Sequence, residues 1–171
     1  MAERDITMMY AAHDAFRRDL RLLVKAPDRD RWKRFSTQLD MHHRAEDKVL
    51  WPRLRSRGVN PELVRAMEAE HSKIDPLLER VSKAFTGGDE PPGPAIAALS
   101  DLLHAHLRHE ESETLPLINQ QEWALLDREM RRRIGLFGLR PYFAWLLEGV
   151  SPDRRKQIVS AIPAPLRRLV A

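Results

Sequence analysis

Two short stretches of the chain carry the same pattern of histidine and acidic residues. Residues 41–52 read MHHRAEDKVLWP and residues 106–117 read HLRHEESETLPL, so both contain H-x3-E-[D/E]-x4-P. Because residues four apart lie on one face of an α-helix, about 6 Å apart, each histidine and its glutamate can point into the same interior. An imidazole beside a carboxylate is a donor set that binds transition metals. The pairs are His42 with Glu46, and His106 with Glu110.

These pairs interrupt apolar stripes that predict four α-helices, because apolar residues recur at alternating spacings of three and four. The first and third stripes contain His13 and His71 at positions where a buried helix face would otherwise be apolar. An unpaired carboxylate is costly in a protein core, so the polar residues on the stripes need a common partner. The stripes run through residues 6–23, 32–49, 64–85 and 96–117.

The connections between the stripes predict an up-down-up-down four-helix bundle. Residues 87–94 read GGDEPPGP and cannot continue a helix. The links at residues 26–30 and 56–60 are short, so consecutive helices must be antiparallel. The predicted fold class is therefore all-α, with residues 1–119 forming a four-helix bundle.

Antiparallel packing brings six polar residues to one depth of this bundle. At 1.5 Å per residue, each lies roughly 9 to 15 Å from the same end. No Lys or Arg on the stripes balances the carboxylates, whereas a metal ion supplies that charge. Six ligands exceed a tetrahedral zinc site; a pair of irons or manganeses fits better, and sulfur-free, nitrogen-rich ligation favours iron. The candidate metal ligands are His13, His42, Glu46, His71, His106 and Glu110.

With these residues in this order, residues 5–119 resemble the hemerythrin family, specifically the bacterial hemerythrin-like (HHE) cation-binding domains. The resemblance implies two non-heme iron ions joined by an oxo or hydroxo bridge. It also implies a protein that binds or senses a small ligand such as oxygen or nitric oxide. A diiron enzyme acting on peroxide and a protein for iron handling are the alternatives. A ferritin-like site would need Glu-x-x-His on two helices, and the stripes carry no such tetrad.

Two positions differ from the oxygen carriers of this family. The carriers have a second histidine one turn after the ligand on the third helix, where this chain has Asp75. Their last carboxylate follows the fourth-helix histidine by five residues, whereas Glu110 follows by four. These differences argue against reversible oxygen carriage. Asp75 is a candidate additional ligand through a kink expected at Pro76, and Tyr10 on the first helix is a candidate neighbour of the site.

Other polar residues beside the stripes are expected to be solvated. His43, His104 and His109 flank ligand positions and are expected in water. Asp47 and Glu111 each follow a ligand along the chain and are expected to face water. A hydrogen bond from one of these acids to a ligand histidine is the alternative.

The last part of the chain differs in charge from the rest. Residues 128–171 carry ten Lys or Arg and three Asp or Glu, whereas residues 1–127 carry 19 and 22. We expect residues 120–171 to be a basic helical extension, interrupted at Gly135, that packs on the bundle while its arginines stay in water. A homodimer contact or a docking surface for a protein partner is the alternative. The residues expected to pack are Phe137, Tyr142, Phe143, Trp145 and Leu146.

Composition excludes several other classes. The chain has no cysteine, which excludes disulfides, thiolate ligands and cysteine nucleophiles. No DNA-binding motif accompanies the arginines, so no nucleic-acid partner is expected. No apolar run approaches the roughly 18 residues of a membrane span. The first residues, MAERDITMMY, are charged and lack an apolar secretory segment, so a cytoplasmic location is expected.

Overall fold

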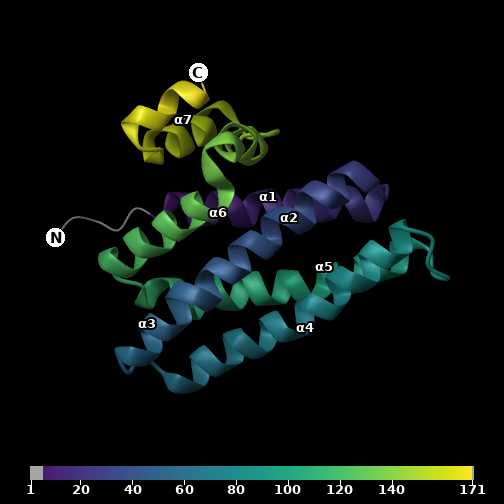
Figure 1. The fold of residues 1–171 in the computed structure, drawn as a ribbon, viewed down its shortest axis with the longest axis horizontal. Helices are drawn as coiled ribbons and strands as arrows, with labels where there is room; N and C mark the ends of the chain where they lie inside the picture. The colour runs from purple at the N-terminus through teal and green to yellow at the C-terminus, as the bar shows by residue number, and fades with distance from the viewer. Residues whose placement is uncertain (1–5, 171) are drawn as a thin grey trace.

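The computed structural model describes residues 6–170, which form helices and connecting loops with no strand in that range (Figure 1). Helix α1 spans Thr7–Lys25 and α2 spans Arg29–Ala45. Helix α4 spans Pro61–Phe85 and α5 spans Pro92–His109. These helices pack side by side as the core of the fold, which confirms the predicted all-α helical bundle.

Both helices that carry the H-x3-E pattern widen into a π-helical turn at the glutamate. The turns span Glu46–Leu50 and Glu110–Thr114, and in each the glutamate carbonyl accepts from the N–H group five residues on. Pro52 and Pro116 follow these turns, and a proline ring clashes with the carbonyl four residues earlier in an α-helix. The apolar stripes predict α-helix through these residues, and the prolines that follow disfavour the ordinary α-helical bond pattern there. Such wide turns are frequent at functional sites.

Short helical segments continue the chain beyond each π turn. Helix α3 spans Trp51–Ser56 and leads to the turn before α4. A 3-10 turn spans Leu115–Leu117 and ends the fourth bundle segment. Pro76, where a kink was expected, lies inside α4, and the helix continues on both sides of it.

Two apolar clusters fill the bundle on either side of the level of the predicted ligands. On α4, for example, His71 lies between Met67 of the smaller cluster and Ile74 of the larger one. The bundle is therefore held by apolar packing on both sides of one polar layer, the level that contains the predicted ligands. The larger cluster includes Phe16, Phe35, Leu39, Ile74 and Leu103. The smaller cluster includes Met9, Leu50, Trp51, Met67 and Leu115.

The C-terminal part of the chain forms further helices beside the bundle (Figure 1). Helix α6 spans Gln120–Leu146, α7 spans Pro152–Ala161, and a 3-10 helix spans Ala164–Leu169. The expected interruption at Gly135 is present, because this residue adopts φ 69° and ψ 165°, which glycine tolerates and other residues do not. None of the helices within residues 6–170 is long and apolar enough to cross a membrane.

The aromatic side chains after Gly135 attach this extension to the bundle. Tyr142, Phe143, Trp145 and Leu146 are buried, as expected. The expectation is wrong for Phe137, which is 96% exposed, because it lies at the break in α6 where no other element covers it.

The buried carboxylate of Asp19 on α1 forms hydrogen bonds that link the extension to the bundle. The indole N–H of Trp145 donates to Asp19 at 2.8 Å, and Arg31 donates to the same carboxylate at 2.7 Å. Arg18 also donates to Asp19 and to the carbonyl group of Trp145. Asp19 is fully buried, so this network fixes the extension through charged hydrogen bonds in the protein interior.

Candidate metal centre

All six predicted ligands lie together in the polar layer of the bundle. They come from all four bundle segments and are buried. The histidines form two pairs, with Nε2 of His13 3.3 Å from Nε2 of His42, and Nε2 of His71 3.2 Å from Nε2 of His106. The six side chains that the sequence predicted at one depth of the bundle therefore lie close together in the structure.

The two carboxylates lie among these imidazole pairs. One oxygen of Glu46 is 3.1 Å from Nε2 of His42, and its other oxygen is 3.6 Å from Nε2 of His71. Glu46 thus faces one histidine of each pair. Glu110 lies 3.3 Å from Nε2 of His13.

Neither carboxylate has a hydrogen-bond partner among residues 6–170, although all four oxygens are buried. Burial and the nearby charge of Glu110 raise the pKa of Glu46 well above its ordinary value. Burial alone would also raise the pKa of Glu110, but contact with His13 lowers it to about 2. A buried carboxylate without hydrogen bonds is strongly unfavourable, and a bound cation would compensate both groups.

The imidazoles fit that cation as donors. Burial, followed by the neighbouring imidazole of His13, lowers the pKa of His42 to about 3, so this ring is neutral at pH 7 and keeps a lone pair. Imidazole nitrogens with carboxylate oxygens suit a transition metal such as iron. Within residues 6–170, atoms close enough to share an ion fall into two groups. The groups are His13, His42, Glu46 and Glu110, and His43, His71 and His106.

Three acidic residues hold the outer nitrogens of the ligand histidines. Nδ1 of His13 donates to Glu111 at 2.8 Å, and Nδ1 of His71 donates to Asp47 at 2.7 Å. Nδ1 of His106 donates to Glu70 at 2.8 Å. A carboxylate on Nδ1 fixes the tautomer in which Nε2 carries the lone pair for a metal. These contacts orient three of the four predicted histidine ligands.

The acidic residues are themselves held in place. Arg17 donates two hydrogen bonds of 2.8 Å to Glu111, and the indole of Trp51 donates to Asp47. Asp47 and Glu111 were expected to face water; both remain partly exposed, yet each bonds a ligand histidine. Glu70 was missed by the sequence argument, and its one signal is its place next to His71.

His43 is not solvated, contrary to the expectation, since it is 3% exposed. The interior-facing surface of α2 is broad enough at this level for two consecutive residues, His42 and His43, to face the polar layer. His104 and His109, which were also expected in water, are half-buried. His104 bonds the carbonyl group of Ser100, and His109 donates to the carboxylate of Glu70.

The two remaining candidates lie apart from the cluster. Asp75 is exposed and belongs to neither group of ligand atoms. Tyr10 is half-buried and packs against the smaller apolar cluster.

A small cavity reaches the site from the side of the extension. Its volume is about 40 Å³, and its wall includes the imidazole of His42. Most of the wall is apolar and comes from α1 and α6, with Asp127 and Arg131 as its charged members. The sequence alone gave no sign of this cavity, because it forms between segments that are more than a hundred residues apart. Its apolar members include Met8, Met9, Ala12, Trp123, Met130 and Leu139.

Comparison with known protein families gives a match for this chain. The family model of the hemerythrin HHE cation-binding domain matches residues 4–118. The match covers the bundle and all of the predicted ligands, and ends before α6. No curated protein and no solved structure matches the chain.

Proposed function

Because the chain belongs to the hemerythrin HHE cation-binding domain family, we propose that its polar layer holds two iron ions and binds a small ligand such as oxygen or nitric oxide. The observation that carries this proposal is the place of Glu46, whose two oxygens face different histidine pairs. One carboxylate shared between two imidazole pairs suits two ions better than one.

The residues divide between the two ions by proximity. His13 and His42 would hold one ion, and His71 and His106 the other. Glu46 and Glu110 supply negative charge to both, which the buried imidazoles cannot do. Two irons held by these residues would supply redox-active metal for binding a small ligand.

The cavity beside His42 supports a small ligand. A volume of about 40 Å³ has room for about three water-sized molecules. Its largely apolar wall suits an uncharged diatomic molecule.

Peroxide chemistry is the alternative, and one residue favours it. Turnover of peroxide needs a proton donor near the metal, and Asp127 lies on the cavity wall. Burial raises the pKa of Asp127 from its ordinary value, so this carboxyl holds its proton at higher pH than a solvated aspartate. Iron handling, a further alternative, would instead require that metal leaves the site easily.

One set of measurements on the iron-loaded protein tests these functions together. Elemental analysis is expected to give two irons per chain, and the ultraviolet-visible spectrum is expected to change on adding oxygen or nitric oxide. Catalytic loss of peroxide would favour the enzyme, and rapid transfer of iron to a chelator would favour iron handling. A reproducible value of one iron or none, with other metals absent, would refute the dinuclear site.

A further inference from the structure

His43 is an unexplained polar residue in the centre of the bundle. It follows His42 on α2, is 3% exposed, and neither of its ring nitrogens has a hydrogen-bond partner among residues 6–170. Buried polar groups are nearly always partnered, and leaving one unpaired costs on the order of 1 to 3 kcal/mol. The two ring nitrogens are therefore either left unpaired at that cost or have a partner that is not a protein group.

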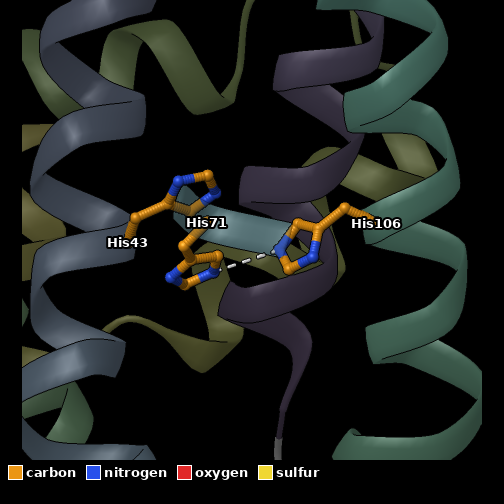
Figure 2. Close-up of side chains that lie close together, drawn as sticks. All are labelled: His43, His71 and His106. Carbon is orange, nitrogen blue, oxygen red and sulfur yellow. Dashed lines mark hydrogen bonds between the residues drawn. The ribbon is translucent and has the colours of Figure 1, made fainter. Parts of the chain in front are cut away.

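The position of the ring indicates which partner that is. His43 stacks on His71 with ring centroids 4.0 Å apart and planes at 14°, and it meets His106 edge-on at 5.3 Å (Figure 2). One nitrogen from each of the three rings lies within 4.8 Å of the others. Figure 2 shows the three imidazoles converging from different helices on one small volume.

We propose that His43 is a third imidazole ligand of the ion held by His71 and His106. The proposal rests on the dinuclear site proposed above and adds an asymmetry to it. One ion would have three imidazoles, from His43, His71 and His106, and the other would have two.

The charge state and surroundings of His43 agree with this role. Burial, followed by the neighbouring His71 and His106, lowers the pKa of His43 well below its ordinary value, so the ring is neutral and keeps a lone pair. Helix α4 supplies no further ligand to this ion, because Asp75, one turn after His71, is exposed. Helix α2 therefore offers the additional donor.

Coordination requires a modest movement of the ring. His43 lies over the face of His71, so rotation about its side-chain bonds must turn one nitrogen toward the shared centre. No hydrogen bond within residues 6–170 holds the ring in its present orientation.

The test compares His43→Leu with His104→Leu, since His104 is a half-buried histidine on α5 outside both ligand groups. In the full chain loaded with iron, His43→Leu is expected to weaken iron binding at least as much as loss of a residue that orients a ligand, which costs about 10- to 100-fold. X-ray absorption at the iron edge is expected to show fewer imidazole neighbours per iron, and only one of the two Mössbauer doublets is expected to change. His104→Leu is expected to leave all three readouts unchanged.

Metal-free protein provides a readout that a purely structural histidine would not give. Removing a buried unpartnered imidazole is expected to raise the thermal midpoint of the metal-free His43→Leu protein while its iron binding weakens. A lower midpoint together with unchanged iron affinity would assign His43 to packing and overturn the proposal. Wild-type protein that fails to bind two irons would instead refute the dinuclear site itself, so the two failures are distinguishable.

Discussion

Glu111 accepts a hydrogen bond of 2.8 Å from Nδ1 of His13, although the two residues lie on different bundle segments. Burial alone would raise the pKa of Glu111, but the bonds from His13 and Arg17 lower it to about 2. The carboxylate is therefore ionised at all ordinary pH values and can only accept. Nδ1 of His13 is therefore the donor in this bond, and a neutral ring that donates from Nδ1 keeps its lone pair on Nε2, on the side of the two carboxylates.

We expect Glu111→Ala to weaken iron binding by about 10- to 100-fold, because loss of the carboxylate frees the ring of His13 to rotate and change tautomer. Glu113→Ala is the matched control, since Glu113 lies in the same π turn and is exposed. Iron affinity from competition with a chelator measures the effect. Equal affinities for the two variants would show that Glu111 does not orient His13.

A second prediction concerns Glu46, the carboxylate between the histidine pairs. Glu46→Ala is expected to lose iron while the helices persist, because the apolar clusters on both sides of the polar layer hold the bundle. Metal content and circular dichroism are measured on the same sample. Asp40→Ala is the control, because Asp40 is a half-buried residue of α2 whose carboxylate bonds Arg44 and lies outside both ligand groups. Full iron content in Glu46→Ala would remove Glu46 from the ligand set.

Much of this site follows from the sequence because it depends on periodicity. A stripe with spacings of three and four identifies the inward face of each helix, and short links fix antiparallel packing. Those two facts suffice to bring His13, His42, His71 and His106 to one level. They predict nothing about residues one position off the stripe, which is why His43 was expected in water.

The acidic partners of the histidines could not be predicted in the same way. Asp47, Glu70 and Glu111 each lie beside a proposed ligand on their own helix, yet each bonds a histidine on another helix. Such bonds depend on the rotation and separation of neighbouring helices, which the pattern within one helix does not encode. The π turns at Glu46 and Glu110 change that rotation further.

Asp19 gives a prediction about the stability of the contact between the bundle and the extension. Asp19→Ala removes the acceptor of the buried indole of Trp145 and one of the two carboxylates bonded by Arg31, which keeps Glu148. Loss of one partner from a buried charged network costs about 3 to 5 kcal/mol, so a clear fall in the free energy of unfolding is expected. Asp14→Ala is the control, because Asp14 is exposed and bonds Arg154 at the surface. Equal unfolding midpoints in denaturant would contradict a structural role for Asp19.

The cavity gives a prediction about kinetics. Met130→Trp is expected to fill the space beside His42 and to slow the binding of nitric oxide to the iron-loaded protein, with iron content unchanged. Leu136→Trp adds the same ring at a position that is 74% exposed and is expected to have no effect. Stopped-flow spectroscopy compares the two rates. Unchanged binding in Met130→Trp would mean that the ligand enters by another route.

The final prediction separates Asp75 from the ligands. The sequence makes Asp75 a candidate seventh ligand, but its side chain is exposed on α4 and belongs to neither group of ligand atoms. Asp75→Asn keeps the shape of the side chain and removes its charge, so we expect unchanged iron content and a change in unfolding free energy within about 0.5 kcal/mol. The same measurements on His43→Leu provide the contrast, because that variant is expected to lose iron affinity. If Asp75→Asn loses iron while His43→Leu keeps it, the additional donor comes from α4 and the assignment of ligands to the His71 ion must be reversed.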